Sequence, residues 1–341
     1  MLSYIPHSKP TINQSDISTV NLQLQSHLLS KGAKVSEFEE LIAKSNNVNY
    51  SVCTSSGSAA LQLVLASLTL PRGSEVILPS YVCKSVYNSV LAQGLVPVLC
   101  DIEQNWLMTF NSVKTKITEN TTAIILVHTF GIDAWDEKFS EFKIPIIEDF
   151  CQGYALQQYT KRPLKGIAGF CSFNATKFIT TGEGGAIITN DEVLHYKIKE
   201  TEGNYIVNST FSDFQASLGI SQLSQLNHFV LARKEKAKNY FSGIKKATLT
   251  NKFQQIEANS ICFRFLLFGD FEVDEIIQKA AEEKIAIRRG VDVMLHKYFK
   301  HDDLMNYTET EIVFNSTISL PIYPSLSGEE QERVINFVNK M

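Results

Sequence analysis

The sequence predicts an α/β protein, with a large domain built on a sheet and a smaller α+β domain after it. Short runs rich in β-forming residues recur at intervals of about one βα unit. Several of these runs are apolar without alternation, which is typical of strands covered on both faces by helices. The last third of the chain changes character and becomes rich in charged, amphipathic segments.

Seven runs have the length and residue preferences of strands. Two of them contain the segments Ala123–Val127 and Ile144–Ile147, which are apolar throughout and so are expected to be covered on both faces. The seven runs are Tyr50–Thr54, Glu75–Pro79, Val96–Asp101, Ala123–His128, Ile144–Asp149, Gly169–Phe173 and Gly185–Thr189.

Helices are expected between and after these strands. Gly57–Leu68 follows a serine-rich cap and is rich in alanine and leucine. Phe214–Phe229 is expected to form one helix that leads out of the large domain. Glu272–Lys284 and Ser327–Lys340 are charged and amphipathic, which predicts helices that each bury one face.

The composition excludes several classes of protein. The 341 residues carry 32 basic and 36 acidic side chains, a formal charge of −4, and this near balance argues against a nucleic-acid-binding surface. With 44% apolar residues the chain can bury a large core, but no apolar run is long enough for a membrane helix. At roughly 150 residues per domain, the length suggests about two domains. We expect a large domain over residues 1–229 and a small domain over residues 230–341.

The six cysteines and the first ten residues indicate the cellular compartment in which the protein works. The six cysteines are scattered singly, with no CxxC pair and no histidine at zinc-ligand spacing, so we expect reduced thiols and no metal site. The segment Met1–Pro10 has no basic region followed by a long apolar stretch, as a secretory signal would have. Both observations favour a cytoplasmic protein.

Three polar features lie at the ends of expected strands, where open α/β sheets place their ligands. In Thr54–Ala60 a strand gives way to small, hydroxyl-bearing residues at a helix start, which suits a phosphate group but is also the pattern of an ordinary serine cap. Asp149 closes a buried strand and needs a cation or several donors, which a structural ion pair could also supply. Lys177 follows another buried strand, although most lysines are simply solvated.

A fourth feature is the glycine-rich run Thr180–Gly185. Its glycines do not have the spacing of a dinucleotide fingerprint and no helix follows them, so we expect a tight loop. Considered together, a phosphate cradle, a buried aspartate and an isolated lysine are what a pyridoxal 5′-phosphate site requires. The lysine would attach the cofactor, the aspartate would keep its ring nitrogen protonated, and the helix start would hold its phosphate.

Motifs along nearly the whole chain occur in the same order in one known family. They include Ser56–Leu61, Ile147–Asp149 and Thr176–Lys177, and the run Thr180–Gly185 followed by Thr189–Asp191 is especially specific. By these motifs the sequence resembles the DegT/DnrJ/EryC1/StrS sugar aminotransferases, which are pyridoxal phosphate enzymes of fold type I, the aspartate aminotransferase-like fold. The resemblance implies a three-layer α/β/α large domain with a mixed, mostly parallel seven-stranded sheet, and a smaller C-terminal α+β domain.

The resemblance also assigns roles to individual residues. It makes Lys177 the catalytic lysine and Asp149 the partner of the ring nitrogen, and it places Gln152 near the phenolic oxygen of the cofactor. Because one phosphate contact comes from the neighbouring subunit in this family, the resemblance implies a homodimer with shared active sites. The phosphate contacts fall on Ser58, Ala59 and Ser172, and on Asn208 from the neighbouring subunit.

One cofactor-contacting position departs from the family pattern. Cys83 stands two residues beyond Tyr81, where the family usually has an aromatic ring that stacks on the cofactor. Either this smaller, softer side chain covers the cofactor ring, or Tyr81 partly compensates.

By resemblance, the reaction transfers an amino group from L-glutamate to a keto sugar. The expected acceptor is a nucleotide-linked 4-keto-6-deoxy or 3-keto sugar, used in cell-surface polysaccharide or other glycan biosynthesis. Candidate residues near the sugar are Arg288, Arg289, His296 and Tyr323, although each arginine could equally be a solvated surface charge. The alternatives are a non-nucleotide ketosugar, such as an oxidised octulosonic acid, or a non-catalytic regulatory or binding protein. Related dehydratases replace the lysine with histidine, whereas Lys177 is present here.

Overall fold

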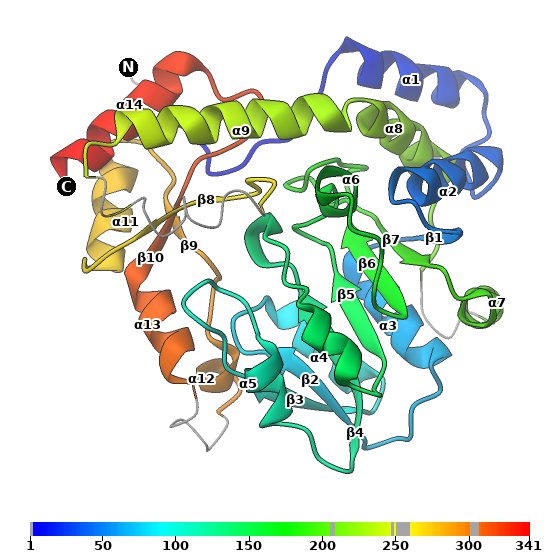
Figure 1. Cartoon of the computed structure of the whole chain (residues 1–341). Helices are drawn as coiled ribbons and strands as arrows, with labels where there is room; N and C mark the ends of the chain where they lie inside the picture. Colours follow the sequence, from blue (N-terminus) through cyan, green and yellow to red (C-terminus); the bar gives the residue numbers. More distant parts are fainter. Residues whose placement is uncertain (1–2, 205–208, 247–248, 250–259, 301–306) are drawn as a thin grey trace.

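The computed structural model describes residues 3–204, 209–246, 249, 260–300 and 307–341, which are arranged around a seven-stranded sheet (Figure 1). The strand order is β1-β7-β6-β5-β4-β2-β3; β7 runs antiparallel to both of its neighbours, and the other neighbouring pairs are parallel. The predicted mixed, mostly parallel sheet is therefore confirmed. The strands are β1 (Tyr50–Thr54), β2 (Glu75–Pro79), β3 (Val96–Cys100), β4 (Thr121–Val127), β5 (Ile146–Asp149), β6 (Ala168–Ser172) and β7 (Gly185–Thr189).

Helices cover both faces of this sheet and give the expected three layers. On one face α3 (Gly57–Ser67), α4 (Lys84–Ala92) and α7 (Glu192–Gly203) join the strands in one apolar cluster. On the other face α2 (Ala33–Ser45) and α8 (Asp213–Ser224) cover the end of the sheet formed by β1, β7 and β6. The rest of that second face packs against loops and against the C-terminal part of the chain.

A long helix connects the sheet region to a smaller α+β unit, as predicted. This helix, α9 (Leu226–Gly243), runs from α8 toward that unit in Figure 1. The unit has a three-stranded antiparallel sheet of order β8-β10-β9. Its elements are β8 (Phe265–Phe268), α11 (Val273–Glu282), β9 (Arg288–Arg289), α12 (Leu295–Tyr298), α13 (Thr308–Ser316), β10 (Thr317–Leu320) and α14 (Gly328–Lys340). The shorter helices elsewhere are α1 (Gln14–Gln25), α5 (Phe110–Lys114), η1 (Thr129–Gly131), η2 (Glu137–Glu141) and α6 (Leu156–Thr160).

The prediction of one helix over Phe214–Phe229 is wrong. The structure divides this segment into α8 and α9, which meet at Gln225. The Gln225 side chain donates to Asp16 Oδ1 and to the carbonyl of Ser221, both at 3.1 Å, and so ties the junction to α1. Because this contact joins residues far apart in the sequence, the local periodicity does not reveal it.

The N-terminal segment lies against the small α+β unit. Ile5 forms a parallel β-bridge with Ile285, and the His7 ring is 3.0 Å from the Ser319 hydroxyl. The division into residues 1–229 and 230–341 stays a prediction, and the structure adds that the first described residues contact the second of these regions.

Two further properties concern membranes and metals. Within the described part of the chain, no helix has both the length and the apolar character needed to cross a membrane. Among the same residues, no group of three or more histidine, cysteine or acidic side chains is placed to hold a metal ion.

Candidate active site

A cavity of about 330 Å³ opens at the carboxyl ends of β5 and β6, beside the first turn of α3. This is where open α/β sheets place their ligands. The structure brings five of the predicted site residues together in its wall. These are Ser58, Cys83, Asp149, Ser172 and Lys177. The other lining residues are Ser56, Gly57, Leu61, Ser85, Val86, Ser89, Cys151, Phe170, Asn174, Thr176 and Glu183.

The start of α3 forms one end of this cavity. Ser56 caps the helix, and its hydroxyl accepts the backbone N–H of Ala59 at 3.1 Å. The cap thus uses the Ala59 N–H, and the phosphate contact of Ala59 stays a prediction, whereas Ser58 lines the cavity. A Cβ atom at Gly57 would lie 3.0 Å from Ser172 Cβ, a tighter contact than most side chains make, so glycine favours this close approach of the helix start to β6. The positive end of the helix dipole therefore faces the cavity and favours an anion there.

Asp149 ends β5 as a buried carboxylate that faces the cavity. Its Oδ1 accepts the backbone N–H of Cys151 at 2.8 Å, and no described cation lies within ion-pair distance. Burial raises the pKa of the Asp149 carboxyl, and the hydrogen bond from Cys151 and the charge of Lys177 oppose this shift. A buried carboxylate without a counter-ion is unfavourable, so this site is suited to a ligand that brings a proton or a positive charge.

Lys177 lies in the turn that follows β6. Its backbone N–H donates to the carbonyl of Asn174 at 2.9 Å, which fixes the turn. Its half-buried side chain makes no hydrogen bond or ion pair with a described residue, and Nζ lies 5.5 Å from the centre of the Phe263 ring. The amine therefore remains available for chemistry in the cavity.

The cavity also fits pyridoxal phosphate in its finer features. The close approach at Gly57 forms a cradle beside Ser58 and Ser172, where a phosphate would meet hydroxyls and the helix end. The Ser89 hydroxyl is buried in the wall without a hydrogen-bond partner among the described residues, so it is free to serve a ligand. With Asp149 and Lys177, these groups match the phosphate, the ring nitrogen and the aldehyde of the cofactor.

Two of the predicted cofactor contacts, Gln152 and Asn208, are not among the lining residues that the structure describes. Gln152 Oε1 accepts the backbone N–H of Phe130 at 2.7 Å, and Gln152 is not part of the cavity wall. Asn208 lies outside the described residues. Their predicted contacts with the cofactor therefore stay predictions.

Cys83 and Tyr81 have different surroundings. Cys83 is the exposed N-cap residue of α4 and lines the cavity. Tyr81 is fully buried and packs edge-on against Phe130 at a centroid distance of 6.1 Å. Of the two residues, only Cys83 lines the cavity, and its contact with the cofactor ring stays a prediction.

Three of the four expected substrate contacts have partners within the protein, and their contacts with a sugar stay predictions. His296 is fully buried, with Nδ1 2.7 Å from the Ser80 hydroxyl and its ring stacked on Tyr307 at 4.4 Å. Arg289 pairs with Asp274 at 2.8 Å and donates to a backbone carbonyl of α13. Tyr323 is buried in the apolar cluster of the small unit. Tertiary packing that the sequence does not reveal uses these three side chains for structure.

Asn174 and Glu183 are among the lining residues that the sequence analysis did not select as site residues. Asn174 Nδ2 donates to Glu183 Oε1 at 2.8 Å, which joins the turn before Lys177 to the glycine-rich loop. The sequence held a signal for each residue: Asn174 lies close to Lys177, and Glu183 lies within the glycine-rich motif Thr180–Gly185.

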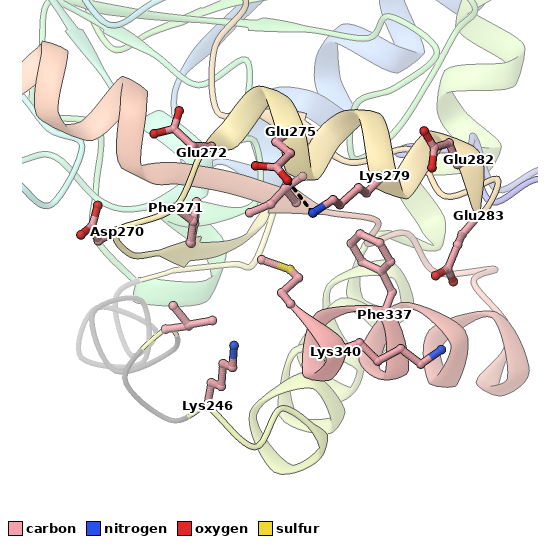
Figure 2. Close-up of a pocket in the computed structure, with 13 residues that line it drawn as sticks. Lys246, Asp270, Phe271, Glu272, Glu275, Lys279, Glu282, Glu283, Phe337 and Lys340 are labelled. Atoms are coloured by element: carbon pink, nitrogen blue, oxygen red, sulfur yellow. Dashed lines mark ion pairs between the residues drawn. The ribbon is translucent and has the colours of Figure 1, made fainter.

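A second cavity, of about 490 Å³, lies in the small unit between α11 and α14 (Figure 2). Its wall is rich in charged side chains, among which Glu275 and Lys279 form an ion pair at 2.5 Å. Glu275 and Lys279 lie on the same helix, and every acidic side chain in this wall is exposed, so the wall has no buried acid. The side chains in the two walls therefore favour the first cavity as the active site.

Comparison with known proteins agrees with this site. The model described as the DegT/DnrJ/EryC1/StrS aminotransferase family matches residues 10–339. The chain belongs to this family. As a member of the DegT/DnrJ/EryC1/StrS family, the protein is an aminotransferase, and the aminotransferases of this family depend on pyridoxal phosphate.

Individual relatives in the family extend over the whole chain. GDP-perosamine synthase of Escherichia coli O157:H7 is 27% identical, and the alignment covers 99% of each chain. The spore coat polysaccharide biosynthesis protein SpsC of Bacillus subtilis is 28% identical, over 98% of this chain and 96% of its own. Among solved structures, Helicobacter pylori PseC, an aminotransferase of pseudoaminic acid biosynthesis, superimposes with a TM-score of 0.90 at 22% identity over 99% of each chain. The pyridoxamine phosphate form of Streptococcus pneumoniae Spr1654, a putative sugar aminotransferase by its description, gives 0.85 at 25% identity, over 99% and 97%.

Proposed function

We propose that this aminotransferase moves an amino group from L-glutamate to a nucleotide-linked keto sugar, of the 4-keto-6-deoxy or 3-keto type, in cell-surface polysaccharide or other glycan biosynthesis. The observation that carries the proposal is the placement of Asp149 and Lys177 in one cavity wall beside the start of α3. The sugar acceptor is supported by relatives whose names refer to perosamine and to spore coat polysaccharide. A further structural relative, DesI, was solved with a TDP-sugar product.

In this proposal the start of α3 binds the phosphate of the cofactor. Ser58 and Ser172 would donate hydroxyl hydrogen bonds, and the helix dipole would favour the negative charge. Ser58 and Ser172 would thus anchor the phosphate at a third point of the wall, while Asp149 and Lys177 would hold and orient the ring.

Asp149 would bind the protonated ring nitrogen. When bound, pyridoxal phosphate supplies an electron sink for the bond that breaks at the donor α-carbon. The Asp149 carboxylate, already accepting one backbone N–H, has a second oxygen free for the ring N–H. A buried carboxylate is a strong partner for that N–H because the local dielectric constant is low.

Lys177 would attach the cofactor and then move a proton. Its free Nζ, released when the donor amine takes its place, would remove the proton from the donor α-carbon as a general base. The resulting ammonium would return this proton to the carbon that receives the amine, first on the cofactor and then, by the reverse steps, on the sugar.

The proposal includes a cytoplasmic homodimer with shared active sites. Exposed apolar residues gather on α1 and on the segment after it, with Leu22 67% and Leu28 70% exposed. The segment also contacts α8, where the exposed Phe214 donates its N–H to the carbonyl of Leu29. Such exposed apolar side chains are typical of a surface covered by a second subunit.

The test is turnover with purified protein, pyridoxal phosphate and L-glutamate, against a panel of nucleotide-linked keto sugars and of ketosugars that carry no nucleotide. We expect one 2-oxoglutarate per aminated sugar, and Lys177→Ala should abolish both products while leaving a folded protein. Turnover only with a ketosugar that carries no nucleotide would contradict the acceptor class. Full activity of Lys177→Ala would contradict the assignment of the catalytic lysine.

A further inference from the structure

A third cavity, of about 790 Å³, lies where α2, α6 and α8 meet (Figure 1). It shares no lining residue with the active-site cavity. Its volume falls within the roughly 300 to 1,000 Å³ that small-molecule sites have. The apolar part of its wall is formed by Leu41 of α2, Ile220 and Leu223 of α8, and Leu226 of α9. Such side chains are suited to packing against the faces of a ring system.

Gln157 of α6 is a buried polar residue in this wall. It is 4% exposed, and neither the oxygen nor the nitrogen of its side-chain amide has a hydrogen-bond partner among the described residues. A buried amide without partners is unfavourable, so the position is suited to a ligand that supplies them. The oxygen needs a donor and the nitrogen needs an acceptor. A carboxylate only accepts and an ammonium only donates, so the fitting ligand carries a donor and an acceptor side by side.

The charges of this wall are all positive. Its described lining residues include three basic side chains and no acidic one. Arg162 is already engaged, because Nε donates to Asp133 at 2.7 Å and Nη2 donates to Glu148 at 2.8 Å. Lys44 and Lys161 are exposed, and neither forms an ion pair with a described residue. These two uncompensated charges favour an anion at the cavity.

The backbone holds Lys161 at the end of α6. Its φ of 56° lies in the left-handed region, which side chains other than glycine, asparagine and aspartate rarely adopt. The ion pairs of Arg162 with Asp133 and Glu148 hold the chain directly after it. One short segment, residues 157–161, therefore presents both the unpartnered amide and a free cation to the cavity.

We propose that this third cavity binds a nucleotide, with the base on Gln157 and the phosphate on Lys44 and Lys161. The edge of a nucleobase places an N–H donor beside a carbonyl or ring-nitrogen acceptor, and a glutamine amide binds such an edge with both of its polar atoms. The faces of the base would pack on the apolar side chains of α2 and α8. An inorganic anion would leave the Gln157 amide unpartnered, and an ionised fatty acid would satisfy only half of it. The site lies outside the active-site cavity, so it does not depend on the proposed function.

Calorimetry with AMP tests the site. AMP is titrated into the protein loaded with pyridoxal phosphate and into Gln157→Met, Lys161→Met and Lys143→Met. Lys143→Met is the matched control, because Lys143 is an exposed lysine outside this wall. We expect Gln157→Met to weaken AMP about tenfold or more through the loss of two hydrogen bonds, Lys161→Met to weaken it a few-fold, and Lys143→Met to leave it unchanged. Gln157→Met should keep the aminotransferase turnover of the unaltered protein.

Other ligands separate a nucleotide site from a simple anion site. Inorganic phosphate should bind far more weakly than AMP, and equal binding of the two would overturn the contact with the base. UMP and GMP also carry an N–H beside a carbonyl, so tighter binding of either one supports the site and identifies its base. An unaltered protein that binds none of the three nucleotides overturns the proposal, as does AMP binding that is unchanged in Gln157→Met.

A covalent label locates the bound nucleotide. The protein is irradiated with 8-azido-AMP, digested and analysed by mass spectrometry. We expect the label within residues 41–47, 157–163 or 220–227, and its loss in Gln157→Met. A label confined to peptides that line the active-site cavity would overturn the proposal. Circular dichroism shows whether each variant is folded, and if Gln157→Met is not, Lys161→Met and the position of the label decide.

Discussion

Glu148 and Asp149 are consecutive acids at the end of β5, yet the fold gives them opposite surroundings. Because side chains alternate along a strand, the two carboxylates point to opposite faces of the sheet. Both are buried, with exposures of 0% and 4%. Only Asp149 lines the cavity.

Glu148 is fully paired. Its Oε1 accepts the backbone N–H groups of Lys165 and Gly166 at 2.9 and 2.8 Å, and its Oε2 accepts from Arg162 at 2.8 Å and lies 2.9 Å from His128 Nε2. Burial alone would raise the pKa of Glu148, but the hydrogen bond and charge of His128, with Arg162 and Gly166, lower it to about 2.

Asp149 has one backbone N–H and no cation, and burial raises its pKa. The contrast teaches that the number of donors distinguishes a structural acid from a functional one more reliably than burial does. Glu148 is satisfied by the protein itself and stabilises the fold. Asp149 is left for a ligand, at some loss of stability in the absence of that ligand.

The largest expected difference between the two acids is in catalysis. Asp149→Asn removes the charge that keeps the cofactor nitrogen protonated, so we expect single-turnover transamination to slow on the order of 10²- to 10³-fold. Glu148→Gln, assayed where it remains folded, should keep a rate within a few-fold of the original. Stopped-flow absorbance with L-glutamate measures both. Equal losses in the two variants would mean that the two faces of β5 are not functionally distinct.

The next largest difference is in stability. Glu148→Gln leaves its donors facing a neutral amide, so we expect the free energy of unfolding to fall by about 3 kcal/mol. Urea unfolding followed by circular dichroism gives this value. A variant as stable as the original protein would show that the Glu148 network contributes little.

The ionised forms of Glu148 and Asp149 should have opposite effects on stability, and the pH dependence of unfolding would show this. The pKa of Glu148 falls from 4.5 to about 2 on folding, so its contribution is present above pH 4.5 and is lost as the pH falls toward 2. The pKa of Asp149 is raised above 3.8 in the folded chain, so its ionisation lowers stability as the pH rises from 3.8, and the loss is complete above the folded-state pKa. In the cofactor-free protein, Asp149→Asn should therefore raise the Tm at neutral pH and have no effect in strong acid. A lower Tm for Asp149→Asn at neutral pH would contradict this prediction.

The smallest expected effect concerns the thiols on either side of the cavity. Burial, followed by the charge of Asp149, raises the pKa of the Cys151 thiol well above its usual value, whereas Cys83 is exposed in the wall. We expect iodoacetamide to alkylate Cys83 first and pyridoxal phosphate to slow this labelling, as mass spectrometry of the digested protein would show. Labelling of Cys83 at the same rate with and without cofactor would place it outside the occupied space.

The sequence was sufficient where chemistry follows from position on a strand or helix. The continuous apolar runs of β4 and β5 predicted a sheet covered on both faces. Asp149, Lys177 and Ser58 were found because each follows a strand end, and such ends meet at one edge of a parallel sheet.

The sequence was insufficient where a side chain is used by a distant partner. His296 and Arg289 have the residue types of substrate contacts, but packing against Ser80 and Asp274 makes them structural.

The most direct test of the central claim is to identify the residue that carries the cofactor. The protein is loaded with pyridoxal phosphate, reduced with borohydride, digested, and analysed by mass spectrometry. The structure predicts one phosphopyridoxyl-labelled peptide, with the label on Lys177, and none in Lys177→Ala. A label on a different lysine, or no label in the unaltered protein, would contradict the assignment of this cavity as the active site.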